Sequence, residues 1–194
     1  LDGKRLGVLV NLFGSGPEHE SVNAIIRTAL DALRAQGAKI IEINDAEFDS
    51  DLSSKRLNVA NYEFGPLFDA FLAQLPEGTG PTSLRAYVEA GRYPAGMNKF
   101  LQQSVAWQAP LAMPEYRDAL QYGDTLRRKI LGLMETQALD VLVYPAQKRP
   151  PLAVGETPRP ERNGIFASAL GFPAIDLPAG FTPPDASAPA GLPV

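Results

Sequence analysis

The sequence contains no cysteine, which excludes disulfide frameworks, thiol nucleophiles and cysteine–zinc sites. Histidine occurs once, at position 19, so a Ser–His–Asp arrangement would have to use that residue. No apolar run approaches the ~20 residues that span a bilayer, and we expect no membrane partner. No signal peptide is visible, so we expect a cytoplasmic protein. Because the chain begins at Leu1 without a methionine, we also expect sequence upstream of it.

The chain also lacks an excess of positive charge. Its net charge of −4 disfavours nucleic acids and anionic membranes as partners, because both require a positive surface. The densest basic cluster, Arg127-Arg128-Lys129, falls late in a predicted helix, where cations suit the helix dipole. With 45% apolar and 21% charged residues among 194, the composition is that of one globular domain, or most of one.

Strand-like and helix-like apolar patterns alternate along the chain, which indicates an α/β architecture. Residues 5–10, 38–43, 140–144 and 174–177 are predicted to be strands. Helices are predicted from Pro17 to a glycine cap at Gly37, and then over 53–75, 83–90, 97–106, 114–138 and 162–170. We treat residues 1–194 as a single portion of an α/β domain, with 182–190 as an exposed loop or linker.

Glycine-containing segments occur inside one predicted helix and directly before another. Gly65-Pro66 is expected to kink or break the helix over 53–75.

Gly14-Ser15-Gly16 lies between a strand and a helix, where phosphate-binding turns occur. The dinucleotide pattern needs a further glycine where Glu18 and His19 stand, so we interpret the segment as an ordinary turn. His19 is offset from the apolar stripe of its helix and is expected to be a solvated surface residue.

Two polar clusters carry weaker signals of chemistry. Ser53-Ser54-Lys55 has charged flanks, whereas a catalytic serine would need glycines that let backbone amides face an oxyanion. We therefore interpret Ser53 or Ser54 as a helix cap. The acidic residues after the second strand do not follow calcium-loop spacing and are interpreted as a solvated loop. We assign no metal site and no catalytic residue. The acidic residues are Glu42, Asp45, Glu47, Asp49 and Asp51.

The proline-rich loop after residues 140–144 is the candidate site. Ligands collect beyond the carboxyl ends of strands in open α/β sheets, and prolines fix the shape of a loop at low entropy cost. Tyr144 offers a ring and a hydroxyl, Pro145 opens the loop, and Asn163 offers an amide. We predict that these residues line a substrate pocket. A rigid connecting loop without a ligand stays open as the alternative.

Four short sequence segments follow one another along the chain in a fixed order. Residues 1–43 contain GKRLGVL and GAKIIEI, and residues 116–144 form a long helical pattern that leads into LDVLVYP. Residues 171–181 read GFPAIDLPAGF, and residues 191–194 read GLPV. In this order the segments resemble the C-terminal half of the amidase signature family, which hydrolyses carbon–nitrogen bonds. Ala146 departs from the pattern, since the family often has threonine there.

The resemblance implies part of the amidase signature fold, a mixed, mostly parallel sheet flanked by helices. It also implies a Ser–cis-Ser–Lys triad in a missing N-terminal half. There a serine would attack a small-molecule amide substrate, and backbone amides would stabilise the oxyanion. No cofactor is implied. No position of this chain matches a catalytic residue of the family, so we expect the chain by itself to be inactive.

Two other interpretations stay open. A non-catalytic α/β binding or interaction module explains the same lack of catalytic residues. An enzyme of another class would use His19 or the acidic loop. An open sheet edge further predicts that two copies of the chain pair into a homodimer.

Overall fold

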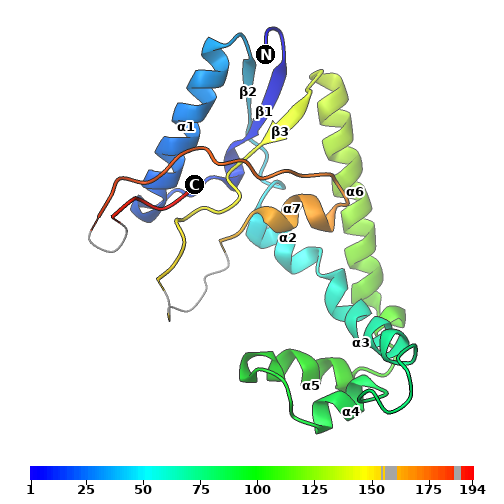
Figure 1. Ribbon diagram of the computed structural model, residues 1–194. Helices are drawn as coiled ribbons and strands as arrows, with labels where there is room; N and C mark the ends of the chain where they lie inside the picture. Colours follow the sequence, from blue (N-terminus) through cyan, green and yellow to red (C-terminus); the bar gives the residue numbers. More distant parts are fainter. Residues whose placement is uncertain (154, 156–160, 186–188) are drawn as a thin grey trace. The chain divides into compact units, whose positions relative to one another are not determined.

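The structure is a computed structural model that describes residues 1–153, 155, 161–185 and 189–194 (Figure 1). The chain forms two compact units. The first contains residues 1–56 and 123–194, and the second contains residues 57–122. The first unit is built around a parallel sheet, whereas the second is helical. No helix among the described residues is long and apolar enough to cross a bilayer.

The sheet of the first unit has three parallel strands. They are β1 (Arg5–Leu9), β2 (Lys39–Ile43) and β3 (Val141–Val143), in the order β2-β1-β3. Leu6 lies opposite both Ile40 and Val141, so the central strand pairs with segments far apart in the sequence. The parallel pairing brings the carboxyl ends of β1 and β3 to the same edge of the sheet. This confirms the predicted α/β class and three of the predicted strands.

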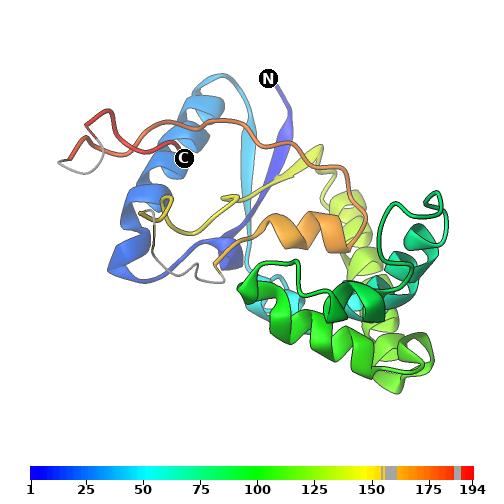
Figure 2. The ribbon, with the colours of Figure 1, turned by 60° about the horizontal axis from the view of Figure 1, so that its bottom comes forward.

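Helices flank this sheet (Figure 1 and Figure 2). The short helix η2 (Pro17–His19) leads into α1 (Glu20–Ala35), and Gly37 follows with a φ of +91°, as the predicted cap requires. Helix α6 (Pro114–Thr136) begins in the second unit and ends in the first. Helices α2 (Ser50–Arg56) and α7 (Gly164–Ala169) pack together, with the rings of Phe48 and Phe166 edge to face at 5.9 Å.

The second unit packs its helices on aromatic side chains. Its helices are α3 (Val59–Leu72), α4 (Leu84–Glu89) and α5 (Asn98–Ala106), with the short η3 (Ala95–Met97) and η4 (Pro110–Ala112) and the start of α6. The buried centre contains Leu84, Val88 and Leu101. The rings and one valine that pack around it are Phe64, Phe68, Tyr87, Tyr93, Phe100 and Val105.

Three expectations about secondary structure are wrong. Helix α3 runs through Pro66 without a break, because flanking rings such as Phe64 and Phe68 hold both of its turns in the same core. The helical pattern instead breaks at residues 57–58, after α2. Residues 174–177 form no strand, since their backbone makes no hydrogen bond to any other described residue. A strand needs a paired neighbour, and the described chain offers none there.

The end of the chain folds back on itself. Phe181 and Pro193 form an antiparallel bridge, and the Thr182 N–H donates to the Leu192 carbonyl at 2.8 Å. These contacts close the segment predicted as an exposed loop. Within it, residues 183–185 and 189–190 are exposed, and residues 186–188 lie outside the described residues.

Gly7 lets the central strand accept side chains from its neighbours. A Cβ on Gly7 would lie 2.7 Å from methyl groups of both Ile43 and Leu139. We predict that Gly7→Ala lowers the free energy of unfolding by about 1–3 kcal/mol through overpacking. Gly132, exposed in α6 with nothing within 4 Å of an added Cβ, is the matched control.

Gly132→Ala should raise the free energy of unfolding by about 0.5–1 kcal/mol, because alanine loses less backbone entropy in a helix. Urea unfolding followed by circular dichroism measures both variants. A shift of the two midpoints in the same direction would contradict this account.

Candidate functional site

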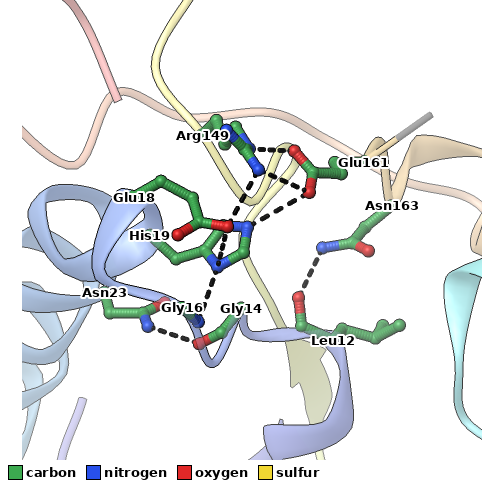
Figure 3. Close-up of polar contacts among 9 residues, drawn as sticks. All are labelled: Leu12, Gly14, Gly16, Glu18, His19, Asn23, Arg149, Glu161 and Asn163. Carbon is green, nitrogen blue, oxygen red and sulfur yellow. Dashed lines mark hydrogen bonds and ion pairs between the residues drawn. The ribbon is translucent and has the colours of Figure 1, made fainter. Parts of the chain in front are cut away.

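The carboxyl ends of β1 and β3 lead into two loops that one amide group joins. The Nδ2 of Asn163 donates to the carbonyls of Leu12 and Pro145, each at 2.7 Å. Figure 3 shows the bond to Leu12. Leu12 ends η1 (Val10–Leu12), directly after β1, and Pro145 follows β3. The Asn163 N–H also donates to the Ala146 carbonyl at 2.9 Å. Asn163 is completely buried, so its amide clamps the two loops together.

The structure brings together Tyr144, Pro145 and Asn163, the residues predicted to line a substrate pocket. The three residues differ in their exposure to solvent. Pro145 and Asn163 are buried, and both amide hydrogens of Asn163 are taken by backbone carbonyls. Tyr144 is half-buried, and its ring lies edge-on against Phe166 at 5.9 Å. Of the three residues, Tyr144 alone offers surface to a ligand.

The hydroxyl of Tyr144 stays protonated at neutral pH. Burial raises its pKa above the usual value, the neighbouring Asp176 carboxylate raises the pKa further, and the Ala167 backbone N–H opposes both. A protonated phenol donates a hydrogen bond and does not act as a base. Tyr144 can therefore donate a hydrogen bond to a carbonyl oxygen at this edge of the sheet.

His19 lies beside the same loops and is buried, which corrects the expectation of a solvated histidine. Its side chain is 9% exposed, and its Nδ1 accepts a hydrogen bond from the Gly16 N–H at 3.0 Å. The His19 N–H in turn donates to the Gly16 carbonyl at 3.0 Å. A Cβ on Gly14 would lie 2.0 Å from the imidazole ring. The ring is buried because Gly14 has no side chain.

Gly14-Ser15-Gly16 therefore has a structural use that differs from phosphate binding. Gly14 makes room for the His19 ring, and its carbonyl accepts a hydrogen bond from Asn23 Nδ2 at 2.7 Å. A Cβ on Gly16 would meet the Glu18 carboxylate at 2.4 Å. The interpretation as a strand-to-helix turn holds, and the glycines beside Ser15 were the signal that could have indicated a buried ring.

Arg149 joins His19 to the loop after β3. Its Nη2 lies 2.9 Å from Glu18 Oε1 and 3.1 Å from Glu161 Oε1, and its Nε pairs with Glu161 Oε2. His19 Nε2 lies 3.3 Å from Glu161 Oε1 (Figure 3). Burial raises the pKa of Glu161, but the bonds from Arg149 and His19 outweigh it and hold that pKa below its usual range. Glu161 is therefore ionised at neutral pH.

This cluster has the donor types of a metal site. The ligand atoms of Glu18, His19 and Glu161 lie within 4.8 Å of one another, the only such group among the residues that the structure describes. However, the Arg149 guanidinium already supplies the positive charge between the two carboxylates. The Nδ1 lone pair is also used by the Gly16 N–H. A divalent cation would have to displace both, so the arrangement fits an internal ion cluster.

The other polar clusters have structural partners. Lys129 Nζ lies 2.6 Å from Asp45 Oδ2 and 2.5 Å from Glu47 Oε2. Hydrogen bonding to Asp45 is the main cause that raises the pKa of Lys129. Asp49 Oδ1 accepts the Leu52 N–H at 2.7 Å and so caps α2. The expectation that Ser53 or Ser54 is the cap is wrong, because both lie inside α2, where Ser53 is fully buried.

A model of the amidase family matches residues 1–194. The chain belongs to the amidase family. It is 28% identical over 194 residues to an indoleacetamide hydrolase of Pseudomonas syringae pv. syringae, a match that covers 97% of this chain and 41% of the relative. It is 28% identical over 211 residues to a glutamyl-tRNA(Gln) amidotransferase subunit of Renibacterium salmoninarum, covering 99% and 39% respectively. The chain thus spans about two fifths of these relatives.

Solved structures show the same fold. A peptide amidase from Stenotrophomonas maltophilia has a TM-score of 0.58 at 21% identity, covering 75% of this chain and 30% of that one. The peptide amidase PAM in complex with the inhibitor chymostatin has a TM-score of 0.62 at 20% identity, covering 99% and 38%. The predicted amidase signature fold is therefore confirmed.

We predict that Asn163→Ala lowers the free energy of unfolding by about 2–5 kcal/mol, because each buried acceptor left without a donor costs about 1–3 kcal/mol. The carbonyls concerned are those of Leu12 and Pro145. Asn44→Ala is the control, since Asn44 is exposed in the same unit, and it should stay within about 0.5 kcal/mol. Urea midpoints that shift equally for both variants would rule out the clamp.

Proposed function

We propose that this chain is the C-terminal part of an amide-hydrolysing enzyme whose serine nucleophile is supplied by a preceding, N-terminal half. The family match and the relatives' greater length support this proposal. Within the 194 residues, the one serine pair beside a lysine, Ser53-Ser54-Lys55, lies in α2 without glycine flanks. Its place inside a regular helix gives the backbone no means to face an oxyanion.

The observation that carries the proposal is an uncovered apolar run between α7 and α1. Ile175, Leu177 and Phe181 are exposed by 79%, 72% and 63%. Figure 1 shows the run in orange, extended past the strands, and Gly180 lies beside Ile25 of α1. The backbone of residues 174–177 also has no hydrogen-bond partner in the described chain. Exposed apolar side chains and free backbone groups together favour a covering segment, which we assign to the N-terminal half.

In the proposed enzyme, this chain binds and orients the substrate. The serine oxygen of the N-terminal half attacks the amide carbonyl carbon, the nitrogen leaves with a proton, and water then releases the acid from the ester. Tyr144, which stays protonated, donates to the carbonyl side of the substrate. Asp176, which lies near Tyr144 and is exposed, accepts from the amide N–H. Asn163 and Pro145 fix the loop that carries Tyr144.

The test uses the native polypeptide from the source organism. Its intact mass and its release of ammonia from small amides, including indole-3-acetamide, are measured beside those of the isolated 194-residue chain. We expect a native chain of about twice this length that releases ammonia, and no release by the isolated chain. Hydrolysis by the isolated chain would contradict the missing nucleophile. A native polypeptide that begins at Leu1 would favour the non-catalytic binding module.

A double substitution tests whether another segment covers the apolar run that contains Ile175 and Leu177. In the isolated chain, Ile175→Ser with Leu177→Ser should change the free energy of unfolding by less than about 0.5 kcal/mol per site, because both residues are exposed. The same change should reduce dye binding and homodimer formation in light scattering. In the longer polypeptide it should cost several kcal/mol, since burying each side chain is worth about 1.5–3 kcal/mol.

Leu131→Ser is the matched control, because Leu131 is an exposed leucine of α6. It should leave the isolated chain's dye binding and pairing unchanged. Equal effects of the double substitution on both polypeptides would show that nothing covers residues 174–177.

We predict that Tyr144→Phe lowers kcat/KM of the longer enzyme by about two- to tenfold, the value of one neutral hydrogen bond. Tyr93→Phe removes a hydroxyl that donates to Asn98 in the second unit and should leave kcat/KM unchanged. Steady-state assays on an amide substrate measure both. An unchanged kcat/KM for Tyr144→Phe would remove Tyr144 from the pocket.

A further inference from the structure

His19 carries the one imidazole of this chain, and it is buried between two segments. Imidazole is the side chain whose ordinary charge change falls between about pH 5 and pH 8. The chain has a single histidine and no cysteine. The side chain of His19 is 9% exposed and lies where the turn after β1 meets the loop after β3. A change in its charge therefore acts on both segments.

The hydrogen bonds fix which nitrogen carries the proton. Nδ1 faces the Gly16 N–H at 3.0 Å and must offer a lone pair to accept from it. The proton of the neutral ring is therefore on Nε2, where it is donated to Glu161 Oε1 at 3.3 Å. In this form both ring nitrogens are satisfied. One ring thus ties the Gly16 turn to Glu161, which lies 142 residues further along the chain.

Protonation removes one of these two bonds. A second proton, on Nδ1, would place two N–H donors against each other at 3.0 Å, so the bond from Gly16 cannot survive. The new donor has another acceptor close by, because Glu18 Oε1 lies 3.9 Å from Nδ1. The bond to Glu161 is kept and gains charge. The ring would exchange Gly16 for Glu18.

The described charged groups near the ring offer an imidazolium a second partner. Among the residues that the structure describes, the charged groups that face the ring are Glu18, Glu161 and Arg149, two negative and one positive, which give −1 around a neutral ring. With an imidazolium the sum is 0. Because Glu18 is shared with Arg149 at 2.9 Å, a bond from His19 to Glu18 competes with that pair.

We propose that His19 is a proton-controlled latch. Its neutral Nε2–H form holds the turn at Gly16 to the loop that carries Arg149 and Glu161, and its protonation breaks the bond from the Gly16 N–H to Nδ1 and re-pairs the ring with Glu18. The latch goes beyond amide hydrolysis and needs no substrate. It acts next to the Asn163 clamp, since Leu12, whose carbonyl Asn163 binds, lies four residues before Gly16.

Nitrogen-15 NMR of the 194-residue chain tests the latch between about pH 8 and pH 5. We expect long-range ring spectra at high pH to show the proton on Nε2 and an accepting Nδ1. The Gly16 amide should then shift with the same midpoint as the ring. A proton on Nδ1 at high pH would overturn the proposal, and so would a Gly16 amide that does not follow the ring.

Two variants separate the parts of the latch. His19→Asn keeps a side-chain oxygen that accepts from Gly16 but cannot titrate, so the Gly16 amide should become independent of pH. Glu161→Gln keeps an acceptor for Nε2 and removes one negative charge beside the ring, so the midpoint of the ring signals should move to lower pH. If the His19→Asn chain does not fold, the Glu161→Gln midpoint decides, and an unmoved midpoint overturns the latch.

Zinc distinguishes the latch from a metal site. Added Zn²⁺ at high pH should leave the His19 and Gly16 signals unchanged, because Arg149 occupies the space between the carboxylates. Loss of the Gly16 bond on stoichiometric Zn²⁺ would overturn the proposal in favour of metal binding by Glu18, His19 and Glu161.

Discussion

The arrangement of the first unit depends on two buried backbone carbonyls, those of Leu12 and Pro145. Leu12 and Pro145 follow neighbouring parallel strands, so their acceptors come to lie at one edge of the sheet and need donors. A single amide group, that of Asn163, satisfies both at 2.7 Å. Helix α7 starts directly after Asn163, and its Phe166 packs against Tyr144 and Phe48. The position of the candidate pocket therefore depends on one buried carboxamide.

Local patterns were enough to predict much of the fold. The strands β1 and β2 are short apolar runs with helical periodicity between them, and each of these signals lies within a few residues. The four ordered segments within residues 1–43, 116–144, 171–181 and 191–194 led to the correct family and fold. The proposed pocket residues also came from local cues, since Tyr144 follows a strand and Asn163 precedes a helix.

The remaining features depend on distant residues and could not be predicted this way. The burial of His19 results from a missing side chain at Gly14 and from Arg149 and Glu161, more than a hundred residues away. Likewise, residues 174–177 have an apolar pattern typical of a strand, but a strand also requires a neighbour that the pattern cannot supply. In α3 the opposite happened, because packing in the second unit overrode the local effect of Pro66.

The division of the first unit into residues 1–56 and 123–194 has a consequence for synthesis on the ribosome. The segment with β1 and β2 emerges first, but β3, which pairs with the other side of β1, is about 130 residues later. The whole helical unit is made in between and can collapse on its own contacts. One edge of β1 must therefore stay unpaired while those residues are translated, and during that time chaperones have reason to bind it.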